Sequence, residues 1–470
     1  MSVVRFLVAG LGGAAGGMLV NARPAYAQDA SRTTSATPPA RAPLRLTLEE
    51  AIAMARAHNR GLRVQTLKVA EQEHRVAQAR ADAFPQLAAD AYFSRTAKTQ
   101  GVVLPTGSLG LSPGGGSIPT SDVTIAQGGK DLFLTSATLS QPLTQLTRIR
   151  AATRAAAADA RATDAARGRT DLDVVYGVQQ LYIGLLVATR RREAAALGVT
   201  AAEAKLQDAQ AAVNAGTVLP AVLQAAIATR LERRQNLLTL DNQIDDLRTD
   251  LNDMLALPLE TALDLAALEP EPDNEASAAD TIPSTLGEHP DVRAATAQVD
   301  KARAEVTVAR AAYIPELSVI GQYVHQSAVP FLPRDNLVVG VRGSWTVFNF
   351  GKREATIAER HVELDEAREN VDRVRSRVSA DVQKSERRVE RARQMRQVAQ
   401  EALVARKEAA RLQRDQSEVG LMAGSEAAQA RFDEAQAEAD NLTAELDYRL
   451  ARAELARAIG RFETDPAARQ

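Results

Sequence analysis

The segment GSWTVFNFGKREATIAERHVEL, residues 343–364, changes its hydrophobic period halfway along. Up to Val347, large apolar residues alternate with small or polar ones, which is the pattern of a strand with two different faces. After Gly351 the apolar residues recur every seven positions, at Ile357, Leu364, Val371 and Val378. Such spacing predicts a long helix packed against other helices. This part of the chain is therefore predicted to be a strand that continues directly into a long helix.

The same order of elements occurs twice along the chain. Each half begins with a helix that a proline ends, and these prolines, Pro85 and Pro315, lie 230 positions apart. Two alternating segments follow each proline, and then a long stretch without proline, Arg148–Asn214 in the first half and Arg353–Glu418 in the second. We therefore predict a mainly α fold with a twofold internal repeat, each half being helix, strand, strand, long helix, turn and helix.

The repeat and the changes in composition divide the chain into segments. They are a signal peptide (1–27), a flexible leader (28–45), a first repeat (46–257, hairpin 85–143, turn near 216), a Pro-rich connector (258–284), a second repeat (285–462, hairpin 315–348, turn near 420) and a tail (463–470). The first repeat is expected to open with a capping box, Thr47-x-x-Glu50, on a helix that runs to Phe84. Its hairpin carries a Gly- and Pro-rich loop, about residues 97–130, which is the main difference in length between the halves.

The N-terminus has the three parts of a secretory signal. Arg5 precedes an apolar, Gly-rich run from Phe6 to Val20, and Ala25-Tyr26-Ala27 supplies a small-x-small cleavage pattern. A membrane-anchoring helix is the alternative, but the run is short and rich in glycine. Past residue 27 we find no stretch of about eighteen apolar residues, so no membrane-spanning helix is expected in the rest of the chain.

Composition excludes several classes of function. The formal net charge of −2 over 470 residues, with basic and acidic residues interspersed, does not favour a nucleic-acid partner. The absence of cysteine excludes disulfides, thiolate metal sites and a lipid anchor on an N-terminal cysteine. The five histidines show no ligand spacing, and no nucleophile–base set is recognisable. We therefore expect neither an enzyme nor a cofactor or metal site.

The four predicted strands suit an outer membrane, because strands of roughly ten residues span it when tilted. Four strands cannot close a barrel, and an open edge in lipid leaves backbone groups without hydrogen bonds. Two copies of the chain would give eight strands and a filled interior, whereas three would give twelve strands and a lumen. The sequence thus favours a β-barrel part built by three copies, with lipid around it.

Aromatic residues gather where strands meet helices. They are Phe84, Tyr313, Trp345, Phe348 and Phe350. In a barrel with helices below it, this level is the membrane interface, where aromatic side chains form a belt. Core packing at the junction is the alternative, and for Phe348 and Phe350 the sequence does not choose between the two. Trp345 has the phase of the outward face, which favours the belt.

Three segments together resemble the TolC family of outer-membrane channels. They are VGVRGSWTVFNFGKREA (339–355), AVNAGTVLPAVLQA (212–225) and SEVGLMAGSEAAQA (417–430). With the repeat, the resemblance covers residues 46–462. It implies a homotrimer in which a 12-stranded barrel continues as a long α-helical barrel across the periplasm. It also implies docking to a periplasmic adaptor and an inner-membrane transporter, for drug efflux or protein secretion.

The resemblance also implies roles for the two glycine turns. Gly216 and Thr217 in the first half, and Gly420 and Leu421 in the second, would form periplasmic tips that close the channel and dock the adaptor. Family members often carry aspartates six and nine residues after the second glycine, where this chain has Glu426 and Gln429. Three copies of Glu426 meeting at the axis would form a constriction that attracts cations. A glutamate on a solvated helix face is the alternative.

The function expected from these observations is a passive export duct in the outer membrane that extends into the periplasm. A periplasmic adaptor also has long helical hairpins, but it needs only one of them. An exported coiled-coil scaffold without a pore would leave the four amphipathic strands unexplained. The sequence does not identify the transported compound.

Overall fold

The computed structural model describes residues 43–95, 97, 101–126, 131–269, 286–327, 333–418 and 423–461. The predicted signal peptide, nearly all of the leader, most of the connector and the C-terminal tail lie outside the described residues, as do Gly420 and Leu421 of the second tip. The description that follows concerns the compact unit that begins at Pro43.

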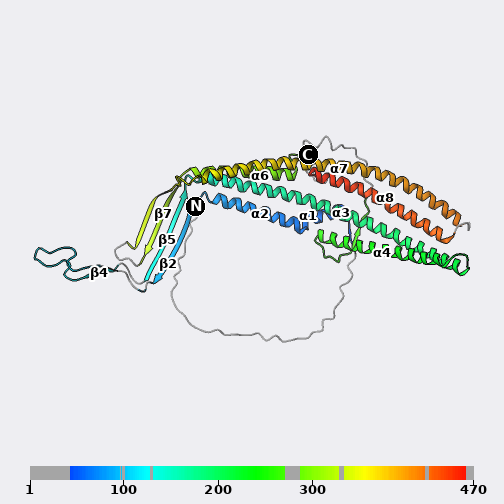
Figure 1. The fold of residues 1–470 in the computed structure, drawn as a ribbon, viewed down its shortest axis with the longest axis horizontal. Coiled ribbons are helices and arrows are strands. Elements are labelled where there is room, and N and C mark those ends of the chain that lie inside the picture. The colour runs from blue at the N-terminus through cyan, green and yellow to red at the C-terminus, as the bar shows by residue number, and fades with distance from the viewer. Residues whose placement is uncertain are drawn as a thin grey trace, which may run out of the picture. The chain divides into compact units, whose positions relative to one another are not determined.

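The two repeats contain the same succession of elements (Figure 1). In the first they are α1 (Leu48–His58), α2 (Arg60–Ala81), β2 (Gln86–Arg95), β5 (Asp131–Pro142), α3 (Leu146–Asn214) and α4 (Pro220–Met254). In the second they are α6 (Pro290–Arg310), the short 3-10 helix η2 (Ala311–Tyr313), β7 (Glu316–Gln326), β8 (Asp335–Ser344), α7 (Lys352–Glu418) and α8 (Gly424–Ile459). The predicted twofold repeat and mainly helical fold are confirmed.

The first helix of the chain is split in two. The capping box is present, since the Thr47 hydroxyl accepts from the Glu50 N–H and the Glu50 carboxylate accepts from the Thr47 N–H. The prediction of one helix as far as Phe84 was wrong, because α1 ends at Asn59 and α2 starts there. Asn59 has a non-helical ψ of 125°, and its side chain accepts from the Leu62 N–H at 3.0 Å. It thereby caps a new helix at a bend.

The seven-residue spacing in α7 marks its contact with α6. Leu364 and Val371 are buried in one cluster with Ala295, Val299, Ala302 and Val306 of α6. Val378 and Val382 continue this contact against Val292 at the start of α6. The apolar spacing predicted from the sequence therefore lines the packed face of α7, and small side chains on α6 allow a close approach.

The long helix α3 packs against α1, α2, α4, α6 and α8. Its largest buried side chains lie near its middle, where Tyr182 and Val178 are fully buried. An 18-residue window of α3 has a mean hydropathy of 1.3, enough for a membrane span by length and composition, which the sequence analysis overlooked. Since 44% of that window is buried in the protein and five other helices contact α3, this composition is that of a core helix.

Two short strands join residues far apart in the sequence beside α3. β1 (Leu44–Leu46) pairs in parallel with β6 (Leu263–Leu265), so the predicted leader and connector each contribute to this ribbon. The Tyr182 hydroxyl donates to the backbone carbonyls of Leu46 at 3.0 Å and Ala266 at 2.7 Å. The leader prediction was therefore wrong for Leu44 and Arg45, which are held in the fold.

The predicted loop at 97–130 also contains regular structure. β3 (Gly101–Leu104) pairs antiparallel with β4 (Val123–Ala126), from Gly101 opposite Ala126 to Leu104 opposite Val123. This ribbon is a separate two-stranded sheet beyond the end of the β2–β5 hairpin (Figure 1). The extra length of the first hairpin is therefore partly a second hairpin.

The main sheet has the order β2-β5-β7-β8, with every neighbouring pair antiparallel. The strands β5 and β7 come from different repeats and pair in the middle of the sheet. β2 and β8 form the two edges, and neither has a second partner among the described residues. Both edge strands therefore have backbone groups available for another chain.

Candidate functional site

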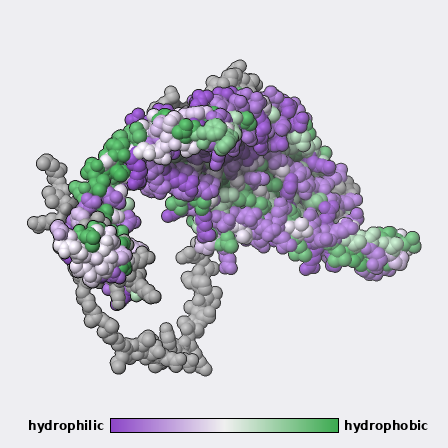
Figure 2. Space-filling view, turned by 60° about the vertical axis from the view of Figure 1, so that its left-hand side comes forward, coloured by the Kyte–Doolittle hydropathy of each residue, from purple (hydrophilic) through white to green (hydrophobic). Residues whose placement is uncertain are grey.

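One face of the sheet is apolar and open. The register places on this face nine large apolar or aromatic side chains that are 38% to 73% exposed: Leu87, Phe93, Phe133, Leu139, Val319, Tyr323, Leu337, Val339 and Val341. Figure 2 shows hydrophobic residues gathered over the strands, whereas hydrophilic residues cover most of the helical part. A patch of this kind marks a surface that contacts lipid or protein rather than water.

Charged and hydrogen-bonded side chains on the apolar face are found at the loop ends of the strands. Arg95 and Asp131 lie 3.4 Å apart at the far end of the first hairpin. Asp335 accepts from the Tyr323 hydroxyl at 2.6 Å and lies 2.7 Å from His325 at the far end of the second. The apolar band therefore ends in a polar rim, as in strands that cross a membrane and emerge at a headgroup layer.

The opposite face of the sheet is mostly small or polar, although it also carries Tyr92, Leu132, Leu134, Ile320, Val324 and Val338. On β2 and β5 it presents Ala88, Asp90, Ser94, Ser136, Thr138 and Ser140, and on β7 and β8 Ser318, Gln322, Asn336, Gly340 and Arg342. The Gln322 amide donates to the Thr138 hydroxyl at 3.3 Å across the two central strands. Such a face suits water, so the sheet separates an apolar surface from an aqueous one.

Hydrogen bonds fix the ends of the strands to the helices. The Thr144 hydroxyl donates to the Pro315 carbonyl at 2.6 Å and accepts from the Leu317 N–H at 2.8 Å, which joins the two repeats. The Gln141 amide donates to the Ala83 carbonyl at 3.0 Å, and Arg148 lies 2.7 Å from Glu316. The sheet is therefore rigidly attached where it meets the helices.

The strand in the quoted segment ends earlier than the alternation predicts. β8 ends at Ser344, so Trp345 and Val347 lie beyond the strand, which corrects the prediction that the strand continues to Val347. Phe350 and Gly351 have positive φ values of 51° and 82°, and α7 starts directly after them. A left-handed turn of two residues thus redirects the chain from strand to helix.

The aromatic residues at this level are exposed. Relative exposure is 54% for Trp345, 66% for Phe84, 72% for Phe348 and 46% for Tyr313. Phe350 is 92% exposed, and its ring lies edge-to-face with Phe348 at a centroid distance of 4.7 Å. In the single chain these rings are therefore not buried in a junction core.

Tyr313 has polar partners on the neighbouring helix. Its hydroxyl donates to Glu354 Oε1 at 3.0 Å, and the Arg353 guanidinium lies 4.6 Å from its ring centre. The hydrogen bond to Glu354 raises the pKa of Tyr313, because it favours the protonated hydroxyl. An apolar ring with a hydrogen-bonded polar end suits the boundary between lipid and water.

The first tip is a tight turn between α3 and α4. Gly216 has a φ of 73°, and no atom lies within 4 Å of the position a Cβ would take. The Thr217 N–H and hydroxyl both donate to the Ala212 carbonyl, at 3.0 and 2.9 Å, which closes the end of α3. Leu219 follows with 75% exposure, so the tip presents an apolar side chain to its surroundings.

The second tip is described only on its two flanks, since Gly420 and Leu421 lie outside the described residues. Glu426 is exposed in the first turn of α8. Gln429, one turn later, is also exposed, and its amide donates to Asp433 Oδ1 at 2.8 Å. Both predicted constriction residues are therefore free to face a neighbouring copy or water.

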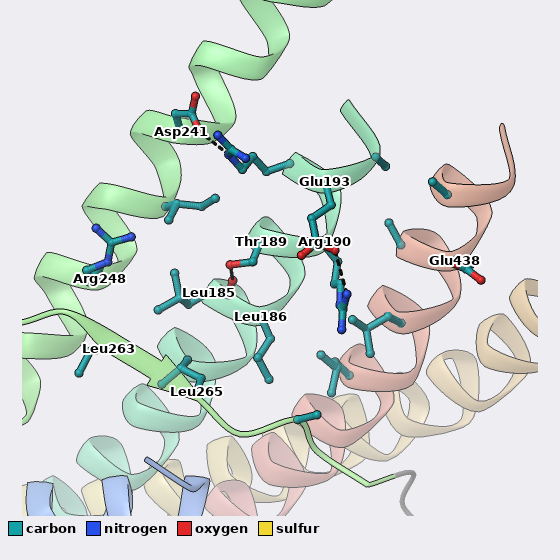
Figure 3. A pocket seen from close by; sticks show the side chains of 18 of the residues that line it. Leu185, Leu186, Thr189, Arg190, Glu193, Asp241, Arg248, Leu263, Leu265 and Glu438 are labelled. Atoms are coloured by element: carbon teal, nitrogen blue, oxygen red, sulfur yellow. Dashed lines mark hydrogen bonds and ion pairs between the residues drawn. The ribbon is translucent and has the colours of Figure 1, made fainter. Parts of the chain in front are cut away.

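A groove of about 1070 Å³ lies between α3, α4, β6 and α8, around the middle of α3 (Figure 3). Leucines such as Leu185, Leu186, Leu263 and Leu265 line part of it. Arg192 on α3 pairs with Asp241 on α4 at 2.7 Å. The described residues contain no group of three or more His, Cys, Asp or Glu that could hold a metal.

The family model for outer membrane efflux proteins matches residues 51–257 and 281–461, which is most of both repeats. Solved structures match across nearly the whole chain. The Campylobacter jejuni outer membrane channel CmeC is 15% identical with a TM-score of 0.71, covering 90% of this chain and 88% of its own. The Neisseria gonorrhoeae outer membrane channel MtrE, in its open state, is 19% identical with a TM-score of 0.61, covering 88% and 89%. No curated protein sequence matches.

The chain belongs to the outer membrane efflux protein family, whose model covers both of its halves. It is an outer membrane efflux channel that extends into the periplasm, with the TolC-like fold that the sequence predicted. Channels of this class are not enzymes, and they form trimers within tripartite pumps. The two alternatives, a periplasmic adaptor and a scaffold without a pore, do not apply to a member of this family.

Proposed function

We propose that three copies of this chain form one continuous duct, with a 12-stranded barrel in the outer membrane and a helical barrel below it. The observation that carries this proposal is the sheet with two unpaired edges, β2 and β8, and one apolar face. Edges in lipid must be paired, and four strands are too few to close on themselves. Three copies give a lumen lined by the polar face.

A mass measurement of the detergent-solubilised protein tests this assembly. A trimer is expected, with the edge strands β2 and β8 protected from amide hydrogen exchange because each is paired with its neighbour in the next copy. A stable monomer with protected edges would contradict the proposal. A dimer would indicate eight strands and a filled barrel, which cannot conduct efflux substrates.

The aromatic residues Trp345, Phe348, Phe84 and Tyr313 form the periplasmic interface belt of this barrel. This role is supported by two observations: the four side chains are exposed, and they all lie at the level where the strands meet the helices. Replacing Trp345 with alanine is expected to weaken membrane anchoring without changing the helical content. Tryptophan fluorescence also reports on the site directly, because the chain has only one tryptophan. Lipids that carry a quencher at the headgroup level should quench it.

The helix tips dock a periplasmic adaptor, which in turn connects the channel to an inner-membrane transporter. The described tip supports this role, because Gly216 and Thr217 form a compact turn that leaves Leu219 exposed at the end of the helical pair. Gly420 and Leu421, which lie outside the described residues, would supply a second surface of the same kind. A photo-crosslinking side chain at Leu219 should capture the adaptor in intact cells, whereas one at the exposed Leu109, in the loop between β3 and β4, should not.

The gate of the duct lies at the same end of the helices. Glu426 and Gln429 occupy the first turns of α8, both are exposed, and in a trimer they would come together around the axis. Glu426 would bring one carboxylate from each copy, which gives a constriction selective for cations. The channel would be passive, and the transporter would choose the cargo.

A further inference from the structure

The two edges of the sheet carry opposite charges on the same face. On β2 the polar face includes Asp90, and on β8 it includes Arg342. These are the only charged residues on the polar face of either edge strand. Both are exposed, and neither has an ion-pair partner among the described residues, whereas helix arginines such as Arg148 and Arg192 do. Their unpaired state raises the question of what each would meet in an assembly.

The ladder gives the relative level of the two charges within one chain. Asp90 is opposite Ser136, Ser136 opposite Val324, and Val324 opposite Asn336 on β8. Arg342 lies six residues further along β8, toward the helices. Within one chain two strands, β5 and β7, therefore lie between the two side chains, which are also six residues apart along the strand axis.

A backbone hydrogen bond shows in which order, from left to right, the four strands appear when the sheet is seen from its apolar face. The Leu317 side chain belongs to the apolar face, and its carbonyl accepts from the Leu143 N–H at 2.9 Å, so it points toward β5. β7 runs away from the helices. For an L-residue in such a strand, viewed from its side-chain face with the helices below, the carbonyl points right. The order from left to right, seen from the lipid, is therefore β8, β7, β5 and β2.

In a closed barrel this order decides which residues meet at the seam between copies. Because strands have a fixed twist, the strands of a barrel lean to the right when they are seen from outside with the helices below. A line that follows directly opposite residues from strand to strand is perpendicular to the strands. As it runs to the right, this line therefore comes closer to the helices. For a tilt of roughly 35–45° and strands ~4.8 Å apart, the descent across four strands is about four to six residues. An even shift is required, because an odd one would mix the polar and apolar faces.

We propose that Asp90 of one protomer pairs with Arg342 of the next across the β2–β8 seam, on the lumen side. This rests on the proposed trimer. Within one protomer, the row of directly opposite residues runs from Asn336 on β8 to Asp90 on β2. Continued across the seam, this row meets β8 of the next protomer four or six residues closer to the helices than Asn336, which is at Gly340 or at Arg342. If the row meets Arg342, the two charges are directly opposite. If it meets Gly340, Asp90 and Arg342 are diagonal neighbours, which the long arginine side chain can bridge. Three such pairs per barrel set the register of the seam.

The register can be measured with cysteine pairs, because the chain has no cysteine of its own. Asp90→Cys is combined in turn with cysteine at Asn336, Val338, Gly340, Arg342 or Ser344, and the trimer is oxidised in membranes. Adjacent strands bring Cα atoms close enough for a disulfide only near the true register. The highest yield of cross-linked chains at position 342 or 340 supports the proposal. A maximum at 336, 338 or 344 in an intact trimer overturns it.

A charge exchange tests whether the pair itself stabilises the seam. Asp90→Arg and Arg342→Asp are each expected to lower the trimer fraction several-fold in mild denaturant, because each brings three like-charged contacts together. The double variant should recover it to within about twofold of the native protein. Equal losses that add in the double variant would overturn the pairing. A native protein that is not a trimer would instead contradict the proposed assembly, so the two failures are distinguishable.

Discussion

Asn59 and His289 lie 230 positions apart, and each side chain caps the inner helix of its own repeat. Asn59 Oδ1 accepts from the Leu62 N–H at 3.0 Å at the start of α2, and His289 Nδ1 accepts from the Asp291 N–H at 3.2 Å at the start of α6. Two different side chains thus perform the same task, which is to supply an acceptor to a free helix N–H. The repeat is therefore one of backbone geometry rather than of residue type.

The cap at His289 should make the fold sensitive to acid. Burial lowers the pKa of His289 below the ordinary 6.5, and its ring must be neutral at Nδ1 to accept a hydrogen bond. On acidification the unfolded chain takes up this proton near pH 6.5, whereas the folded chain takes it up only at a lower pH. The neutral His289 therefore stabilises the fold fully above pH 6.5, and this contribution is lost as the pH falls below 6.5. We expect thermal stability to fall as the pH drops from 7 toward about 5.

The control for this prediction is His289→Asn, which keeps a capping acceptor that does not titrate. Its melting temperature should change less between these two pH values than that of the native protein. Asp291 and Arg169 lie close to His289 and act on it in opposite directions, so both are left unchanged. An identical pH dependence in the two proteins would show that other groups cause the acid sensitivity.

Tyr182 should be a strong anchor of the β1–β6 ribbon. Its hydroxyl is the donor to both the Leu46 and the Ala266 carbonyls, in a fully buried position. Tyr182→Phe keeps the ring but leaves the Ala266 carbonyl without this donor, and we expect a loss of about 1–2 kcal/mol in the free energy of unfolding. Hydrogen exchange should rise first at residues 44–46 and 263–265. Unchanged exchange there would contradict the anchor.

The same residue predicts an alkaline limit. Burial raises the pKa of Tyr182 to about 12. The unfolded chain loses the hydroxyl proton near pH 10, the ordinary tyrosine value, whereas the folded chain keeps it to about pH 12. The protonated Tyr182 therefore stabilises the native state fully below pH 10, and this stabilisation is lost as the pH rises toward 12. The stability of the native protein should therefore fall between these values more than that of Tyr182→Phe. Parallel curves for the two proteins would contradict this linkage.

Gly460 and Gly216 both have positive φ, but only one of them is crowded. A Cβ at Gly460 would lie 3.0 Å from His289 Cδ2 and 3.1 Å from Pro290 Cδ, whereas one at Gly216 would meet nothing within 4 Å. Gly216→Ala should therefore cost only the backbone strain of about 1–2 kcal/mol. Gly460→Ala should cost more, since it also displaces the cap of α6. Chemical denaturation of the two variants measures the difference, and equal losses would contradict it.

The sequence predicted elements whose cause is local. The spacing of Leu364, Val371 and Val378 predicted the packed face of α7, and Thr47 with Glu50 predicted the first cap, because each depends on residues within a few turns of one helix. The alternation of Val339 and Val341 with Gly340 and Arg342 likewise predicted the two faces of β8. Amphipathic periods of this kind are set before any distant contact forms.

The features missed by the sequence analysis depend on distant partners. The strand Leu44–Leu46 is only three residues long and exists because β6 pairs with it. The bend at Asn59 is held partly by the Met254 carbonyl, which accepts from the Asn59 amide at 3.0 Å. The β3–β4 ribbon was concealed by a composition rich in glycine and proline. Which way Glu426 faces remains a prediction, because it depends on other copies of the chain.

The β3–β4 ribbon should be dispensable for assembly. It forms a separate two-stranded sheet, and the described residues of the second hairpin contain no equivalent. Replacing residues 101–126 with a short Gly-Ser linker should leave the trimer and its thermal stability unchanged. Added protease should cleave the native loop from outside intact cells, if that loop is extracellular. Loss of the trimer in the deletion variant would show that the ribbon is part of the assembly.

The gate prediction concerns Glu426. If the tips close the duct, three Glu426 carboxylates face the axis, and a bound cation relieves their mutual repulsion. Divalent or trivalent cations added on the periplasmic side should then reduce the conductance of the channel in planar bilayers. Glu426→Gln should lose this block while it keeps the trimer. The effect should be modest, because each protomer contributes a single acid and the amide of Gln429 is occupied by Asp433.

Asp433 supplies the matched control for the gate experiment. It is a carboxylate on the same helix, two turns from Glu426, and it already lies near Arg406 at 3.8 Å. Asp433→Asn removes the same charge, so it should leave the cation block intact if the constriction is at Glu426. Equal cation sensitivity in the native protein and in Glu426→Gln would place Glu426 on an ordinary solvated helix face. A loss of block in Asp433→Asn alone would move the constriction two turns away from the tip.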